Sequence, residues 1–187
     1  IDKPDRLILD LDPGADVTWV MVREAAQLVH ALLEELELAS FLKTSGGKGL
    51  HVVLPLKPQL GWDEVKKFSA AMVRHLASIV PQRFVAKSGP ANRVGRVFVD
   101  YLRNGRGATT VAAWSARARP GMGISVPLAW SELPGLKSLP PWSVANHADR
   151  LTIGDTPWKQ YERSRQSLTG ARRALASIGA QPRRNRS

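Results

Sequence analysis

The chain has 187 residues, of which 43% are hydrophobic, and it carries six tryptophans, no cysteine and a formal net charge of +11. This composition is typical of a folded globular domain and excludes a disordered chain, while the lack of cysteine excludes disulfides and thiolate metal sites. No apolar run reaches the roughly 18 residues that a membrane span needs, and the charged first residues are unlike a signal peptide. We therefore expect a cytoplasmic protein without a membrane partner.

The first half of the chain predicts short apolar strands alternating with two amphipathic helices. Residues 6–14 are typical of a buried strand that ends in a turn, and residues 16–38 predict a long helix capped by the aspartate at its start. Residues 40–43 and 50–56 predict two strands joined by a glycine-rich loop. Residues 62–79 predict the second helix, because apolar residues recur there at three- and four-residue steps.

The second half carries fewer regular signals. Residues 96–102 predict a strand and are followed by a glycine-rich turn, after which residues 109–114 are the candidate for one more strand. The proline and glycine content of residues 120–141 predicts a loop, and residues 158–178 predict a final basic helix. Together these elements predict an α+β fold in which helices cover one face of a sheet and the other face stays open.

The positive charge is concentrated in two segments. Residues 83–119 hold eight arginines or lysines and one acid, residues 159–187 hold the same numbers, and residues 1–40 are acidic. Basic segments on an otherwise ordinary domain suggest a polyanionic partner, most commonly nucleic acid. For the arginines after residue 182, a solvated tail is an equally good interpretation.

Three aspartates stand in apolar strands. Asp10 and Asp12 are two residues apart, so their side chains share a face, and carboxylates this close repel each other unless a cation such as Mg²⁺ or Mn²⁺ lies between them. Asp100 is the single acid of a later strand. If the two strands are neighbours, the three carboxylates can hold two ions for in-line phosphoryl transfer. The alternatives are strand-end aspartates that cap or face solvent, and an ion pair of Asp100 with Arg103 or Arg117.

The segment KTSGGKGLH, residues 43–51, resembles a phosphate-binding cradle. Its glycines let backbone N–H groups approach an anion, and Ser45 and Lys48 can donate hydrogen bonds from their side chains. The spacing is not that of the Walker loop, and a strand rather than a helix follows. A plain hairpin turn is the alternative for the loop, and a packed core histidine is the alternative for His51.

Two further arginines are candidates for phosphate contacts. In residues 115–119 the spacing of Arg117 and Arg119 places both side chains on one side of an extended segment. The planar guanidinium matches the oxygens of a phosphate. Solvated surface arginines are the alternative interpretation.

These motifs together resemble one family, the polymerase module of bacterial DNA ligase D in the archaeo-eukaryotic primase superfamily. The resemblance runs from the first residues to about Trp158, and it rests on LDLDPG at 9–14, KTSGGKGLHV at 43–52, VFVDYLRN at 97–104, SARARPG at 115–121 and VPLAWSEL at 126–133. It implies an RRM-like, mostly antiparallel catalytic sheet packed with helices. It also implies a metal-dependent nucleotidyltransferase that adds nucleotides, preferably ribonucleotides, to DNA 3′ ends during non-homologous end joining.

The resemblance also implies the site residues, the cofactors and the partners. Two Mn²⁺ (or Mg²⁺) ions, a primer–template DNA end, nucleoside triphosphates, Ku and a ligase module in the parent chain are expected. Arg103 is expected to face the active site, and His51 lies within the shared motif without an assigned contact. The metal-binding carboxylates are expected to be Asp10, Asp12 and Asp100, and the contacts to the nucleotide phosphates are expected from Ser45, Lys48, Arg93 and Arg117.

The resemblance also sets the expected domain organisation. Residues 1–158 are expected to be the catalytic core, without the segments that precede the first strand in the family, and residues 159–187 a basic C-terminal helix and tail. The first strand is then expected to have an exposed edge that promotes self-association.

Three rival functions remain open. A haloacid-dehalogenase-type phosphatase would lack its second acidic pair here, and a glycosyltransferase using Asp-x-Asp would not require two basic segments. The third rival is a catalytically incomplete fragment that binds nucleic acid or Ku.

Overall fold

The computed structural model describes residues 2–138 and 140–180. Its centre is a six-stranded sheet with the strand order β4-β5-β1-β3-β2-β6, in which all neighbours are antiparallel except β4 and β5. The mostly antiparallel α+β architecture is therefore confirmed. The strands are β1 (Arg6–Pro13), β2 (Phe41–Thr44), β3 (Leu50–Pro55), β4 (Phe84–Val85), β5 (Val97–Asp100) and β6 (Pro127–Leu128).

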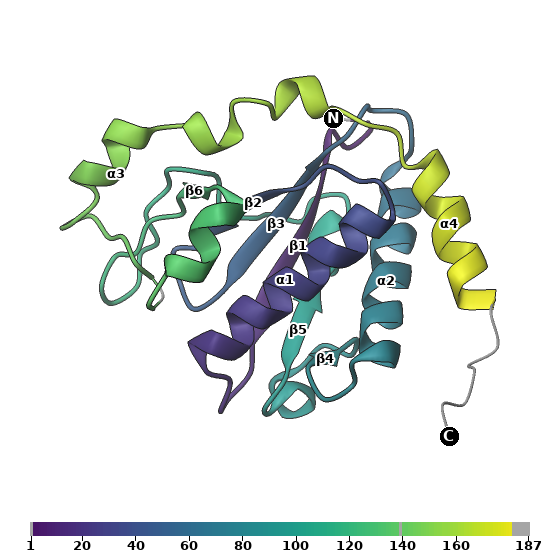
Figure 1. Ribbon diagram of the computed structural model, residues 1–187, viewed down its shortest axis with the longest axis horizontal. Helices are drawn as coiled ribbons and strands as arrows, with labels where there is room; N and C mark the ends of the chain where they lie inside the picture. Colours follow the sequence, from purple (N-terminus) through teal and green to yellow (C-terminus); the bar gives the residue numbers. More distant parts are fainter. Residues whose placement is uncertain (1, 139, 181–187) are drawn as a thin grey trace.

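Two long helices, α1 (Trp19–Glu35) and α2 (Trp62–Ile79), cover one face of this sheet (Figure 1). Their predicted apolar stripes are buried together with Leu7, Leu9 and Leu11, the alternate residues of β1. Each side chain of this kind contributes roughly 1.5–3 kcal/mol when it is fully buried. Because Leu7, Leu9 and Leu11 face the helices, the residues between them face the opposite side of the sheet.

The start of α1 corrects a prediction. Thr18, not Asp16, is the N-cap, and its Oγ1 accepts a hydrogen bond from the backbone N–H of Met21 at 3.4 Å. Asp16 has a φ of 63°, in the left-handed region, so it belongs to the turn before the helix.

The first strand has no free edge, which corrects a second prediction. β1 pairs with β3 on one side and with β5 on the other. The two outer strands of the sheet, β4 and β6, have two residues each. Short strands of this kind offer little backbone for pairing with another chain, so the expected reason for self-association is removed.

The second face of the sheet is open only in part. The side chains of Ile8 and Val53 lie on this face and are 8% and 2% exposed. The segment that carries Trp158 and Tyr161, called the C-terminal strap below, lies over this face. Trp158 donates from its indole N–H to the carbonyl of Leu42 at 2.8 Å and stacks on Tyr161. Both rings also contact the ring of Phe41 edge-on. The expectation of an open face therefore holds only at the end of β1 that carries the aspartates.

The C-terminal region also departs from the predicted helix over residues 158–178. Two short 3₁₀ helices, Thr156–Trp158 and Glu162–Ser164, precede α4 (Thr169–Ala180), and α3 (Ala148–Ile153) was not predicted. The helix α4 packs beside α2 (Figure 1), and Leu168, Ala171 and Leu175 join the main hydrophobic core. The arginines at 183, 184 and 186 lie outside the described residues.

The candidate strand at residues 109–114 does not form. Trp114 has a φ of 63°, which breaks the extended conformation, and this segment runs as an irregular loop across the open end of the sheet. Three more 3₁₀ helices lie further along the chain than α2, at Pro90–Arg93, Leu102–Asn104 and Trp130–Gly135.

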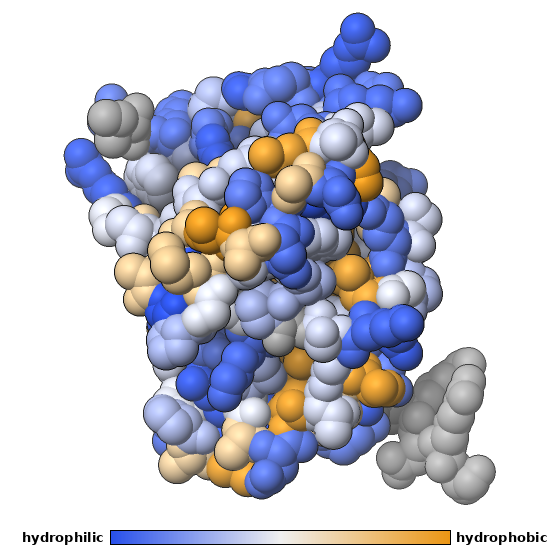
Figure 2. All heavy atoms as spheres, turned by 90° about the vertical axis from the view of Figure 1, so that its left-hand side faces the viewer, coloured by the Kyte–Doolittle hydropathy of each residue, from blue (hydrophilic) through white to orange (hydrophobic). Residues whose placement is uncertain are grey.

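The molecular surface is mixed in character. The face shown in Figure 2 is largely hydrophilic, with separate small hydrophobic patches among the polar side chains. Among the described residues, no helix has the length and apolar character needed to cross a membrane.

Candidate active site

Four polar side chains form a row across the open end of the sheet. Strand pairing sets Asp100 of β5 opposite Asp10 of β1, Asp10 opposite His51 of β3, and His51 opposite Lys43 of β2. Asp12 lies two residues further along β1 on the same face. The predicted neighbourhood of the two aspartate strands is therefore confirmed, and it brings Asp10, Asp12 and Asp100 together.

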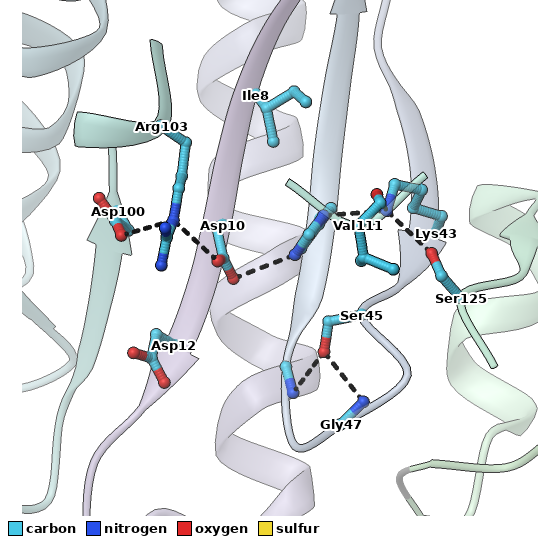
Figure 3. A network of polar contacts seen from close by, with 12 residues as sticks. Ile8, Asp10, Asp12, Lys43, Ser45, Gly47, Asp100, Arg103, Val111 and Ser125 are labelled. Atoms are coloured by element: carbon cyan, nitrogen blue, oxygen red, sulfur yellow. Dashed lines mark hydrogen bonds and ion pairs between the residues drawn. The ribbon is translucent and has the colours of Figure 1, made fainter. Parts of the chain in front are cut away.

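Two arginines accompany these carboxylates. Arg103 lies between two of them (Figure 3), with its Nε 3.0 Å from Asp100 Oδ2 and 3.7 Å from Asp10 Oδ2. Arg93 pairs with Asp12. The ion pair of Asp100 with Arg103, which the sequence left open as an alternative, is thus present. Asp12 and Asp100 are thus paired with partly exposed arginines, while Asp10 also contacts the buried His51.

Arg103 is held in place by the residue that follows it. The side chain of Asn104 is 3% exposed, and it accepts from the Ile8 N–H and donates to the Ile8 carbonyl, both at 2.8 Å. Asn104 thereby continues the pairing of β1 beyond the end of β5 and fixes the 3₁₀ turn Leu102–Asn104 on β1. This turn sets Arg103 above the two aspartates.

Arg93 depends on a close approach of two backbones. A Cβ added at Gly14 would lie 1.7 Å from the carbonyl oxygen of Arg93, so only glycine fits there. The Gly14 N–H also donates to the Arg96 carbonyl at 3.0 Å, which ties the segment carrying Arg93 to the end of β1.

The two aspartates that face each other across β1 and β5 differ in proton affinity. Burial opposes ionisation of Asp10, but the contact with His51 and the charges of Arg103 and Lys43 outweigh it and hold the pKa of Asp10 below its ordinary value. Burial raises the pKa of Asp100, although the Leu102 N–H and Arg103 partly offset the effect. Unequal carboxylates of this kind occur at functional sites.

The far end of the row is a buried lysine and histidine pair. Lys43 is 3% exposed, and its Nζ lies 3.0 Å from His51 Nδ1, while His51 Nε2 lies 3.3 Å from Asp10 Oδ1. Burial lowers the pKa of Lys43 to about 7, against the attraction of Asp10. Burial also lowers the pKa of His51. His51 is therefore both packed in the core, as the alternative interpretation had it, and in contact with a candidate metal ligand.

The glycine-rich loop is shaped by Ser45. Its side chain accepts hydrogen bonds from the N–H groups of Gly47 at 3.3 Å and Gly49 at 3.2 Å, and the residue is 4% exposed. In this structure Ser45 organises the loop from inside. At Gly46, with φ of 68°, a Cβ would lie 2.8 Å from the Gly123 carbonyl oxygen, so the loop needs glycine to pack against the 117–123 segment. Lys48 is exposed at the tip of the loop.

A cavity of about 740 Å³ lies between these groups. Its floor carries Asp10 and Asp12, and the glycine-rich loop forms one wall. Its basic lining residues are Lys48, Arg93, Arg103, Arg117 and Arg119. An acidic floor beneath a basic wall suits a polyphosphate bound through divalent cations. A second, smaller cavity of about 290 Å³ adjoins Asp10 and is lined by Thr109 and Thr110.

Sequence reasoning missed Lys43 and the threonines as members of the site. Arg119, a candidate phosphate contact in the sequence, does line the cavity. A signal for Lys43 was present. A loop of residues 45–49 between two antiparallel strands pairs residue 43 with residue 51 by counting alone, which sets Lys43 beside His51. Nothing in the local pattern indicates the threonines, because the loop that carries them has no regular structure.

The donor set suits a hard divalent cation, although no metal cage is preformed. Within residues 2–138 and 140–180, no three His, Asp or Glu side chains are close enough to form a ready metal site. The three aspartates nevertheless share one face, and carboxylate oxygens are the donors that Mg²⁺ and Mn²⁺ prefer. Their present partners are Arg93, Arg103 and the buried His51, and the side chain of Arg103 is 43% exposed. The residues therefore fit the metal that the resemblance implies, once Arg93 and Arg103 turn aside.

The site thus consists of three aspartates on the open face of a mostly antiparallel sheet, beside a glycine-rich loop and a cavity with basic lining residues. Residues 1–158 match the family described as LigD, primase-polymerase domain. The chain belongs to this family.

Individual relatives agree with this assignment. The chain is 51% identical over 181 residues to the multifunctional non-homologous end joining protein LigD of Pseudomonas aeruginosa, covering 96% of this chain and 22% of that protein. It is 33% identical over 128 residues to the LigD protein of the same description from Mycolicibacterium smegmatis, covering 68% of this chain and 17% of that one. The chain thus spans about a fifth of the length of these relatives.

A solved structure has the same fold. The polymerase domain of Mycobacterium tuberculosis ligase D in complex with DNA superposes with a TM-score of 0.77 at 29% identity, covering 88% of this chain and 57% of that one.

Proposed function

We propose that this chain is the catalytic core of a nucleotidyltransferase that adds nucleotides, with a preference for ribonucleotides, to DNA 3′ ends in non-homologous end joining. The observation that carries the proposal is the convergence of Asp10, Asp12 and Asp100 on one face of the sheet, with Asp10 and Asp12 lining a cavity that also has five basic residues. Membership of the LigD primase-polymerase family supports the same reaction.

The three aspartates have one role in this proposal. They would hold two Mn²⁺ or Mg²⁺ ions, which supply Lewis-acid activation and charge stabilisation for in-line phosphoryl transfer when bound. Without metal, Arg103 pairs with Asp10 and Asp100, and Arg93 pairs with Asp12. Because Arg103 is half-exposed and bound only through its side chain, it can leave the carboxylates without disturbing the sheet.

The basic residues of the cavity have the second role. Lys48 and Arg117 face it from the glycine-rich loop and from the 115–119 segment, and Arg117 also contacts the Ser45 carbonyl at 3.4 Å. We assign them to the triphosphate of the incoming nucleotide, where charge-assisted hydrogen bonds are strong. Arg93 and the backbone of the loop at Ser45 also bind this triphosphate.

The partners are also part of the proposal. A DNA end is the proposed nucleic-acid substrate, in line with the DNA bound to the M. tuberculosis polymerase domain, and the net charge of +11 favours a polyanion. Ku, a ligase module in the parent chain, and a place at the bacterial nucleoid during repair are proposed for the whole protein.

The alternative function is a chain that binds nucleic acid or Ku without catalysis. The charge fits this alternative equally well, but binding alone does not explain three carboxylates on one face, two of which line a cavity with basic residues. The two functions are separated by measuring extension and DNA binding on the same proteins.

The test uses a DNA with a recessed 3′ end, one ribonucleoside triphosphate and Mn²⁺. Alanine at Asp10, Asp12 or Asp100 should lower the rate of addition roughly a thousand-fold, because several kcal/mol of metal-dependent stabilisation is lost. DNA affinity should change little. Near-normal extension by any of these variants would overturn the assignment, and absence of extension in the unmodified chain would favour the binding alternative.

A further inference from the structure

Lys43 is a buried charged residue to which the proposed reaction gives no task. It lies in β2 on the same face as the aspartates, in register with His51 and, through it, with Asp10. Burying an ammonium group at 3% exposure is costly unless hydrogen bonds satisfy it. The ammonium group of Lys43 therefore needs a hydrogen-bond acceptor for each of its N–H bonds.

The hydrogen bonds of the Lys43 ammonium fix the protons of its neighbours. Its Nζ lies 2.8 Å from the Val111 carbonyl oxygen, 2.8 Å from Ser125 Oγ and 3.0 Å from His51 Nδ1. The carbonyl can only accept, and Ser125 donates its own hydroxyl proton to the Thr44 carbonyl at 2.7 Å, so it accepts from the lysine. An ammonium group has three N–H bonds and no acceptor. The third N–H therefore points at Nδ1, which must carry a lone pair.

The hydrogen bonds of Lys43 determine the tautomer of His51. With a lone pair on Nδ1, the ring proton of neutral His51 is on Nε2, which lies 3.3 Å from Asp10 Oδ1. The other tautomer would turn a lone pair toward the carboxylate and repel it. The remaining oxygen of Asp10, Oδ2, faces Arg103 and Asp100 (Figure 3).

We propose that Lys43 is a positioning residue, which holds His51 in the Nε2–H tautomer so that Asp10 presents its free oxygen to the metal. The proposal rests on the proposed function for the role of Asp10, but the tautomer itself does not depend on catalysis. Partners behind a metal ligand fix its orientation, and their loss typically lowers metal affinity roughly 10- to 100-fold.

A purely structural lysine is the competing explanation. Lys43 also ties β2 to the loop at Val111 and to Ser125, and it could serve only to hold these segments together. This role would not require any particular tautomer of His51, and it would not make metal affinity depend on the ring.

Nitrogen NMR of ¹⁵N-histidine protein distinguishes the two roles. The chain has four histidines, and the spectrum of His51→Gln identifies the signal of His51. At pH 6, below the pKa of about 7 that burial gives Lys43, the unmodified chain should show Nε2–H and an unprotonated Nδ1. An Nδ1–H signal for His51 would overturn the proposal without any variant of Lys43.

Lys43→Met supplies the second arm, with Lys57→Met as the matched control because Lys57 is an exposed lysine just beyond β3. In Lys43→Met, His51 should no longer be purely in the Nε2–H tautomer. The affinity for Mn²⁺, measured by EPR, should fall about 10-fold or more. Lys57→Met should change neither. Unchanged Mn²⁺ affinity in a folded Lys43→Met protein would contradict the proposal.

A double-substitution cycle completes the test. In His51→Leu no side-chain atom can link Lys43 to Asp10. Lys43→Met should therefore weaken Mn²⁺ binding by no more than about 2-fold in this background, since the coupling between the two residues has been removed. An equal loss in both backgrounds would show that Lys43 acts structurally. None of these readouts requires nucleotide addition, so a failure of the proposed function is recognised separately.

Discussion

At the scale of single residues, Lys43 links the site to stability. Its pKa of about 7 in the folded chain is below the 10.5 of a free lysine. Between these two values the unfolded chain binds more protons than the folded one. The free energy of unfolding must then rise with pH across this window, by up to about 1.4 kcal/mol per pH unit for one proton.

We therefore predict that replacing Lys43 by methionine changes the pH dependence of stability. The difference in unfolding free energy, Lys43→Met minus unmodified chain, should fall steadily from pH 7 to pH 9.5, because only the unmodified chain gains stability over this range. Urea unfolding at several pH values measures it. The Lys57→Met control should give a constant difference, and a constant difference for Lys43→Met would show that Lys43 stays charged in the fold.

The cavity residues Lys48 and Arg117 give a second prediction. If they bind the triphosphate, alanine at either position should lower kcat/KM for the nucleotide by an amount equivalent to roughly 1–3 kcal/mol. DNA affinity should change much less. A variant that loses DNA affinity, with an altered salt dependence but normal nucleotide use, would place that side chain on the DNA backbone instead.

Some residues of the site could be predicted from the sequence and others could not, for a physical reason. Asp10 and Asp12 were predictable because strand periodicity alone sets them on one face. Their contact with Asp100 needed the strand order, which the periodicity does not contain. Ser45 was predicted to donate to phosphate, whereas its Oγ accepts hydrogen bonds inside the loop; its predicted role remains untested.

At the scale of elements, the turn after β5 carries the next prediction. Asn104 makes two hydrogen bonds to the backbone of Ile8 from a buried position. Asn104→Leu should lower the free energy of unfolding by about 1–3 kcal/mol, because it leaves a buried N–H and carbonyl without partners. It should also reduce nucleotide addition, since Arg103 loses its support.

Chemical denaturation and the extension assay check both effects. Gly105→Ala is a suitable control in the same turn, because the added methyl group meets its nearest atom at 3.4 Å, an ordinary contact. If Asn104→Leu unfolds like the unmodified chain, Asn104 is not a structural continuation of β5.

Elements with long periodic patterns were predictable, and short ones were not. The helices α1 and α2 and the strands β1, β3 and β5 follow from their apolar spacing. The outer strands β4 and β6 have two residues each, which is too short for any periodicity. The C-terminal strap depends on Trp158 and Tyr161, which stack on each other and contact Phe41 edge-on. Such long-range contacts are absent from local sequence patterns.

At the scale of the whole molecule, the fold gathers the basic residues of one segment at a single cavity. The basic segment 83–119 supplies Arg93, Arg103, Arg117 and Arg119 to one cavity, although these residues come from separate turns. The acidic floor belongs to β1. The fold thus brings opposite charges, distant along the chain, to the two sides of a single site.

The central claim is that the three aspartates together hold two divalent ions. EPR titration with Mn²⁺, in the presence of a nucleoside triphosphate that resists cleavage between its α- and β-phosphates, counts these ions directly. We predict two Mn²⁺ ions per chain for the unmodified protein and the loss of at least one in Asp10→Asn, in Asp12→Asn and in Asp100→Asn. The same number of ions, bound with the same affinity after all three aspartates are replaced, would contradict the account.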